Sequence, residues 1–148
     1  MAPQTLLVLV DDAGLFRSAD GGDSWTKVGS GLPGLAVREI AADPNEPARL
    51  FAAFEQGLFR SADGGATWTR VEGALAQEDV EAVAVAPDGK VYAGSFGGVF
   101  RSTDAGATFT PIGDGLPVSD VRALAVAGSP PRLWAGLAGG SVWSTALE

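Results

Sequence analysis

The chain has 148 residues, about the length of one domain, and 46% of them are apolar, which is enough to bury a core. Cysteine and histidine are absent, which excludes disulfides, thiolate metal sites and the commonest general base. The net charge of −8 disfavours nucleic acid and anionic membranes as partners, because both are negatively charged. No apolar run approaches the ~20 residues that span a bilayer, and no basic segment precedes Leu6–Val10. We therefore expect a soluble chain without signal peptide or membrane span, whose compartment the sequence leaves open.

The first unit, residues 1–34, consists of short apolar runs separated by turn residues. Its predicted strands are Thr5–Val10, Gly14–Ser18 and Ser24–Val28. Because Thr5–Val10 is almost wholly apolar, we expect a strand buried on both faces.

The following units, residues 35–75 and 76–117, carry four such runs each, which we name A to D. The predicted strands are Val37–Ala42, Leu50–Phe54, Gly57–Ser61 and Thr67–Val71, then Ala82–Ala86, Val91–Ser95, Gly98–Ser102 and Thr108–Ile112. Residues 118–148 add Val121–Ala127, Leu133–Leu137 and Ser141–Thr145. Alanines and glutamates between 74 and 86 favour a helix locally, but valines recur there at the same places as in the other units, so we expect strands.

One stretch marks each unit. It runs from Phe16 to Trp25, from Phe59 to Trp68 and, with less agreement, from Phe100 to Phe109, and a fourth start is visible at Val142-Trp143-Ser144. The period of about 42 residues with four short strands is typical of a propeller blade. The sequence thus predicts an all-β fold, a single β-propeller or half-propeller domain over residues 1–148 with about 3.5 to 4 blades. The A strands are expected innermost, where small side chains suit the crowded axis.

The turn between strands C and D is the most regular part of the repeat. Its glycines allow a tight turn, its aspartates can accept hydrogen bonds from amides one or two residues on, and its serines tie the turn in the same way. The aromatic residue anchors the following strand. Ala105 replaces the first glycine in the third copy, so we expect the second glycine to be the more constrained. The residues concerned are Ser18, Asp20, Gly22, Trp25, Ser61, Asp63, Gly65, Trp68, Ser102, Asp104, Gly106 and Phe109.

This motif resembles the Asp-box, or BNR repeat, of sialidases, xyloglucanase-type glycoside hydrolases, sorting-receptor ectodomains and photosystem-assembly propellers. The resemblance extends over the whole chain and implies propeller blades. It also implies that the box braces the outer part of each blade, on the face away from the ligand. A calcium site at Asp20 and Asp23 is the alternative, although the cluster has too few alternating oxygen ligands.

The resemblance also allows a test for catalysis. A sialidase-like site implies three converging arginines and a tyrosine nucleophile. Arg17, Arg60 and Arg101 belong to the repeat, so we expect them at equivalent places on successive blades, each beside a carboxylate, and the only tyrosine, Tyr92, lies in a predicted strand. A xyloglucanase-type site needs two opposed carboxylates, and no spacing singles out a pair. The candidates are Asp11, Asp12, Glu55, Glu78, Asp79, Asp114 and Asp120. We expect no catalytic residue, no metal, no cofactor and no enzymatic activity.

Propeller ligands usually meet the B–C turns and the connections between blades. The candidate ligand-face residues are Asp11, Asp12, Glu55, Gln56 and Phe96. The first unit lacks strand A and the last lacks strand D, and the unpaired edges favour closure of the ring by a second copy. We expect a homodimer of eight blades, with a four-bladed monomer as the alternative. The sequence predicts a scaffold or binding module with a protein or glycan ligand. The alternatives are a glycan-binding or glycoside-hydrolase-related fragment of a larger Asp-box protein, and a designed or minimal repeat protein without ligand.

Overall fold

The computed structural model describes residues 5–10, 13–34, 37–113 and 120–147. Its first sheet contains β1 (Leu6–Val10), β2 (Gly14–Ser18) and β3 (Thr26–Val28). The second contains β4 (Val37–Ala42), β5 (Leu50–Phe54), β6 (Gly57–Ser61) and β7 (Thr69–Arg70). The third contains β8 (Val80–Val85), β9 (Val91–Ser95), β10 (Gly98–Ser102) and β11 (Thr110–Ile112). The fourth contains β12 (Val121–Ala127), β13 (Arg132–Leu137) and β14 (Val142–Ala146).

Each sheet is an antiparallel meander whose strand order follows the sequence, with three, four, four and three strands. The all-β fold built of propeller blades is therefore confirmed, and the sheets are called blades 1 to 4. The described residues contain one short 3₁₀ helix, η1 (Gly73–Leu75), and the remainder of the alanine-rich stretch contains β8. No helix among the described residues is long and apolar enough to cross a membrane.

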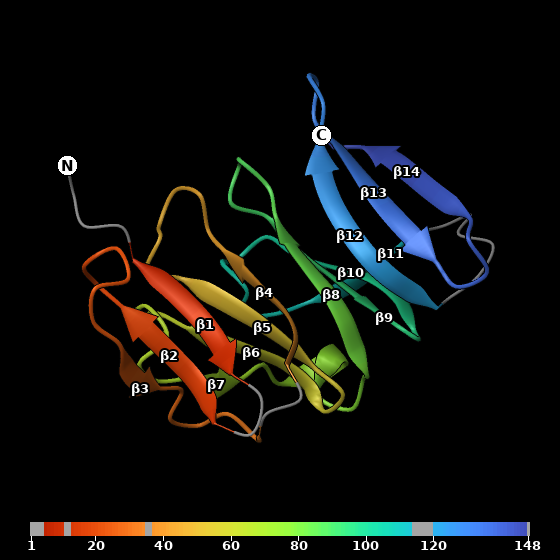
Figure 1. Ribbon diagram of the computed structural model, residues 1–148. Helices are drawn as coiled ribbons and strands as arrows, with labels where there is room; N and C mark the ends of the chain where they lie inside the picture. Colours follow the sequence, from red (N-terminus) through yellow and green to blue (C-terminus); the bar gives the residue numbers. More distant parts are fainter. Residues whose placement is uncertain (1–4, 11–12, 35–36, 114–119, 148) are drawn as a thin grey trace.

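The blades are arranged in an open arc (Figure 1) with blade 1 at one end and blade 4 at the other. Three apolar clusters hold neighbouring blades together: one joins blades 1 and 2, one joins 2 and 3, and one joins 3 and 4. The A strands β4, β8 and β12 lie next to one another along the inner edge. Blades 1 and 4 lie at opposite ends of the arc, so the described residues do not form a closed ring of four blades.

Two local expectations are wrong, and each has a physical reason. β1 is not buried on both faces: Leu6, Val8 and Val10 are 37, 41 and 42% exposed, because no strand of the described chain covers that side. The fourth copy of the repeat is shifted by one residue, since Leu133 pairs with Thr145 where Val91 pairs with Ser102. Thr145 and not Ser144 therefore takes the position of the turn serine.

Candidate functional site

The three repeated turns (residues 18–25, 61–68 and 102–109) share one hydrogen-bond network. In the second, the Ser61 hydroxyl donates to Asp63 Oδ1 at 2.7 Å and accepts from the Gly65 amide at 2.9 Å. The Thr67 amide and hydroxyl donate to the Asp63 carboxylate at 2.9 and 2.6 Å. The aspartate thus binds the residue four positions on, not one or two as expected.

The same distances recur, within about 0.1 Å, around Asp20 and Asp104. Three donors surround the ionised carboxylates of Asp20 and Asp63 and four surround that of Asp104, which lowers their pKa. The Thr67 hydroxyl and amide, followed by the Ser61 hydroxyl, lower the pKa of Asp63 to about 2. The pKa of Asp20 falls well below its ordinary value, chiefly through the Ser18 hydroxyl, and that of Asp104 through the Thr108 hydroxyl. These carboxylates are fully engaged in bracing the turn.

The second and third repeated turns also lie against the preceding blade. A Cβ on Gly106 would clash with the ring of Phe51, and a Cβ on Gly65 would lie 3.3 Å from Leu7 Cδ2. Ala105 adopts a positive φ of 58°, so the first position of the turn accepts alanine while the second meets the neighbouring blade. Trp68 and Phe109 are 4 and 6% exposed in these contacts, whereas Trp25 of blade 1 is 42% exposed.

Arg17 lies beside the first glycine of the repeated turn on the next blade. A Cβ on Gly64 would lie 3.4 Å from Arg17 Nε, which is buried without a hydrogen-bond partner. Arg17, Arg60 and Arg101 take part in none of the ion pairs found among residues 5–10, 13–34, 37–113 and 120–147. The expected pairing with neighbouring carboxylates is not found among the described residues, and only Arg101 of the three lines the cavity between blades 3 and 4.

A charged cluster lies on the inner strands. Each A strand has an irregularity in its register at its second residue, which places Arg38, Glu81 and Arg122 at equivalent bulges. Glu81 Oε1 lies 3.3 Å from a guanidinium nitrogen of both arginines. Arg38 also contacts Asp79 at 3.6 Å, and Arg122 contacts Asp120 at 2.8 Å. The sequence analysis missed this Arg–Glu–Arg array, although the charged residue directly after the first valine of each A strand was a visible signal.

Phe96 lies beside this cluster at the B–C turn of blade 3. Its ring is 46% exposed and the Arg122 guanidinium is stacked 4.8 Å from the ring centre. Glu78 accepts a hydrogen bond from the Ser95 hydroxyl at 2.7 Å. Glu55 and Gln56 occupy the equivalent turn of blade 2, and both are exposed. Asp11 and Asp12, and the catalytic candidate Asp114, lie outside the described residues.

Three of the carboxylates considered for catalysis are engaged with neighbours. Glu78, Asp79 and Asp120 contact Ser95, Arg38 and Arg122 respectively. Tyr92 is buried inside β9, where burial raises the pKa of its phenol. No group of three or more acidic side chains able to hold a metal occurs in the part of the chain that the structure describes. The arrangement offers an aromatic ring and compensated charges, which suit binding.

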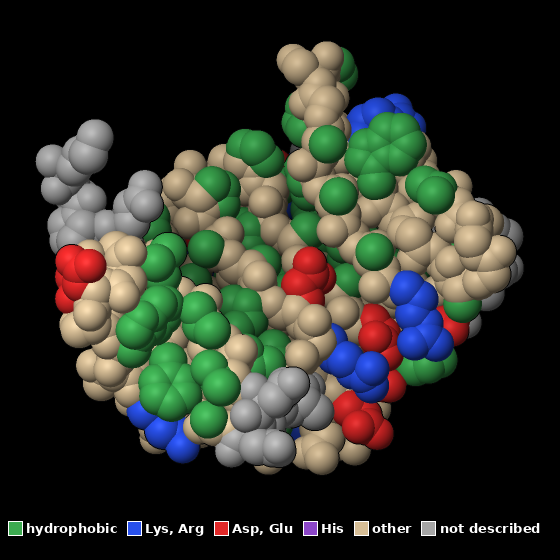
Figure 2. All heavy atoms as spheres, viewed as in Figure 1, with side chains coloured by type: hydrophobic (Ala, Val, Ile, Leu, Met, Phe, Trp, Pro, Cys, Tyr) green, Lys and Arg blue, Asp and Glu red, His purple; other side chains and the backbone are tan. Residues whose placement is uncertain are grey.

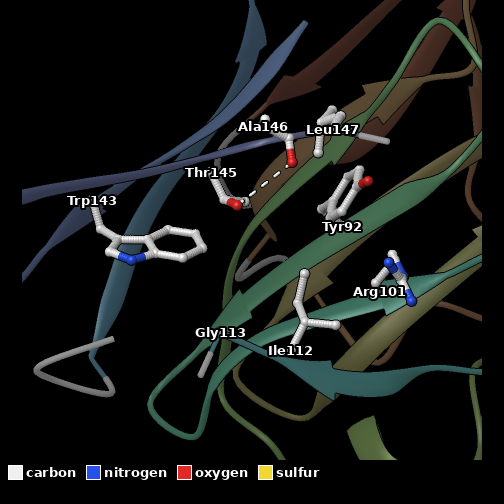
Figure 3. Close-up of a pocket in the computed structure, with 8 residues that line it drawn as sticks. All are labelled: Tyr92, Arg101, Ile112, Gly113, Trp143, Thr145, Ala146 and Leu147. Carbon is white, nitrogen blue, oxygen red and sulfur yellow. Dashed lines mark hydrogen bonds between the residues drawn. The ribbon is translucent and has the colours of Figure 1, made fainter. Parts of the chain in front are cut away.

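A cavity of about 330 Å³ lies between blades 3 and 4. Figure 3 shows Tyr92, Arg101 and Ile112 from blade 3 on one side and Trp143 and Thr145 from β14 on the other. The register makes Tyr92 the equivalent of Phe51, which Gly106 of the next blade covers. The cavity therefore occupies the place of a repeated turn, which is absent from the described part of blade 4.

The geometry defines an arc of β-propeller blades, and solved structures of propellers match it. An ancestral GH74 enzyme matches with a TM-score of 0.78 and 17% identity over 97% of this chain, which corresponds to 21% of that protein. Ycf48 bound to D1 peptide matches with a TM-score of 0.64 and 18% identity, over 95% of this chain and 45% of that one. The computationally designed Ika4 protein matches with a TM-score of 0.70 and 14% identity, over all of this chain and 88% of that one.

These identities show the shared fold alone. The chain spans between a fifth and about a quarter of the length of the GH74 structures it matches. No protein-family model matches the sequence, and no curated protein matches it either.

Proposed function

We propose that this chain is a non-enzymatic β-propeller module, a scaffold or binding unit in which the three repeated turns are Asp-boxes with a bracing role. The engagement of its acidic groups carries this proposal. Each turn aspartate is saturated by hydroxyl and amide donors, as Asp63 illustrates. Near the inner edge, Asp79 and Asp120 lie against arginines and Glu78 accepts a hydrogen bond from Ser95. Glu39 accepts the Val83 amide, so each of these four carboxylates already has a neighbouring partner.

The ligand face of this module is the side that carries the B–C turns. Phe96 and Arg122 form an exposed aromatic–guanidinium pair there, next to the Arg38–Glu81 contact. An apolar ring with charged groups at its edge fits a protein segment or a glycan, both of which combine apolar and polar surface. The proposal includes no cofactor and no metal.

The module closes its ring with a second copy. Both ends of the arc expose apolar side chains, and two chains of four blades make a ring of eight. Light scattering tests this. We expect a particle of twice the 15.0-kDa chain mass, and a particle of the single-chain mass would overturn closure by a second copy.

The second candidate is a glycan-binding or glycoside-hydrolase-related unit. The similarity to GH74 structures and the exposed ring of Phe96 favour it. The match to the designed Ika4 protein equally fits a minimal repeat protein without ligand. A glycan array combined with a hydrolysis screen separates these alternatives. We expect no turnover; hydrolysis abolished by Asp79→Asn or Asp120→Asn would overturn the non-enzymatic assignment, and glycan binding reduced by Phe96→Ala would identify the ligand class.

A further inference from the structure

The two ends of the arc carry different apolar faces. The leading face, on blade 1, consists of Leu6, Val8, Val10, Phe16 and Trp25. Val8 and Phe16 are direct partners in the β1–β2 ladder, and four of these residues line one apolar hollow of about 290 Å³. Figure 2 shows hydrophobic side chains gathered over β1 and β2, at the left of the molecule. Contiguous exposed apolar side chains of this kind are typical of surfaces that contact another protein.

The trailing face lies on the outer side of blade 4 and consists of Ala125, Trp134, Val142 and Ser144. Trp134 pairs directly with Ala125 on one side and Ser144 on the other, so these three side chains share a face of the sheet. Val142 stands two residues before Ser144 and points to the same side. Trp134 is 41% exposed and Val142 is 68% exposed.

The large apolar residues at the equivalent places of the inner blades are buried in contacts between blades. Trp134 corresponds to Phe51 and Tyr92, which are 0 and 1% exposed. On the leading side, Trp25 corresponds to Trp68, which is 4% exposed. The apolar residues at both ends therefore occupy positions that are buried wherever a neighbouring blade is present.

Every contact between blades inside the chain joins one trailing side to one leading side. The second glycine and the aromatic residue of a repeated turn lie on the second residue of the preceding B strand, as Gly106 and Phe109 lie on Phe51. Gly65 and Trp68 lie on Leu7 in the same way. Continuing this rule beyond blade 4 places Gly22 and Trp25 of another chain on Trp134.

We propose that the leading face of one copy docks on the trailing face of a second copy, with the first repeated turn seated on Trp134. This assignment rests on the self-association proposed above and specifies its geometry. The contact is head-to-tail, so each of the two junctions repeats the internal arrangement of the blades. Pairing two leading faces would instead set Trp25 against Trp25, an arrangement that occurs nowhere between the blades of the chain.

A cross-linking experiment tests the geometry, because the chain contains no cysteine. The arginine position of β2 lies against the first glycine of the next turn, as Arg17 lies against Gly64. Ser144 holds that position on blade 4, so it should approach Gly21 of the second copy. One preparation carries Asp23→Cys and the other Ser144→Cys, both at partly or fully exposed sites, and a short bis-maleimide is added to their mixture.

We expect covalent dimers in the mixture and loss of this product when either variant is treated alone. Glu72→Cys, exposed on blade 2, replaces Asp23→Cys in the matched control and should give no product with Ser144→Cys. Cross-linking of Asp23→Cys to itself, or no product from a mixture that light scattering shows to be dimeric, overturns the head-to-tail geometry while self-association stands. A monomeric particle for the unmodified chain overturns the proposed closure itself.

Discussion

Replacing the turn tryptophans one at a time separates bracing within the chain from contact between copies. Trp68 is 4% exposed and packs between blades 1 and 2, whereas Trp25 is 42% exposed on the leading face. A fully buried tryptophan replaced by alanine costs about 3–5 kcal/mol of unfolding free energy. The buried fraction of Trp25 is about six-tenths of that of Trp68, so Trp25→Ala should cost about 2–3 kcal/mol in the isolated chain.

Concentration distinguishes the two variants. Association that buries Trp25 stabilises the folded chain by mass action, so the thermal midpoint of the unmodified protein should rise with protein concentration. Trp68→Ala should lower the midpoint at every concentration and keep this slope. Trp25→Ala should lower the midpoint less in dilute solution and remove most of the slope, because the anchor seated on Trp134 is lost.

Calorimetry over a hundredfold range of protein concentration is the assay, with far-ultraviolet circular dichroism to show that both variants retain their sheets. The reasoning is refuted if Trp25→Ala costs as much as Trp68→Ala in dilute solution. It is equally refuted if Trp25→Ala keeps the full concentration dependence.

Three further predictions concern single positions. Because the pKa of Asp63 is lowered in the folded chain, its stabilising contribution is present above the unfolded pKa of ~4 and is lost as pH falls to about 2. The urea midpoint should therefore fall across this pH range. Asp63→Asn should make the midpoint less dependent on pH. Gly106→Ala should lower the free energy of unfolding by about 3 kcal/mol, because it adds a clash with Phe51 to a positive φ. Gly89 has a similar φ and open space around it, so Gly89→Ala should lower the same quantity by only about 1 kcal/mol. Urea unfolding measures both values, and equal values would contradict the close packing of the turn. Burial raises the pKa of Glu39, whose carboxylate accepts a hydrogen bond from the Val83 amide at 2.8 Å. Glu39→Gln should therefore leave the free energy of unfolding at pH 7 unchanged or raise it, whereas Glu39→Ala should lower it by about 1–3 kcal/mol. An equal loss of stability in both variants would show that the charge itself is needed.

The repeat predicted the blades well because it combines strand alternation with an unambiguous turn. Bounds such as Leu50–Phe54 and Val121–Ala127 agree with the structure to the residue. The D strands are shorter than predicted, because the first residues assigned to them belong to the turn: the Thr67 amide binds Asp63 before β7 begins at Thr69.

Elsewhere the sequence lacked the necessary information. In blade 4 three residues separate Leu137 from Ser141, whereas only two separate Phe54 from Gly57, which shifts the fourth copy of the repeat by one residue. The sequence pattern did not reveal this extra turn residue, because alanine and glycine fit turns of either length. The exposure of β1 could not be predicted from its composition. An apolar strand that another blade covers and an apolar strand at the exposed end of the arc have the same sequence pattern.

Each blade has two different contact surfaces, a leading and a trailing face, and this explains why the two ends of the arc expose apolar side chains. Each unit supplies a turn aromatic for the blade before it and a B-strand side chain for the blade after it. An open row of such units leaves the leading face of its first blade and the trailing face of its last blade without a neighbouring blade. Elongated repeat proteins solve this with polar terminal units. Here both ends are apolar and exposed, with Val8 and Trp25 on the leading face and Trp134 and Val142 on the trailing face. Contact between a leading and a trailing face would bury the apolar side chains of both ends.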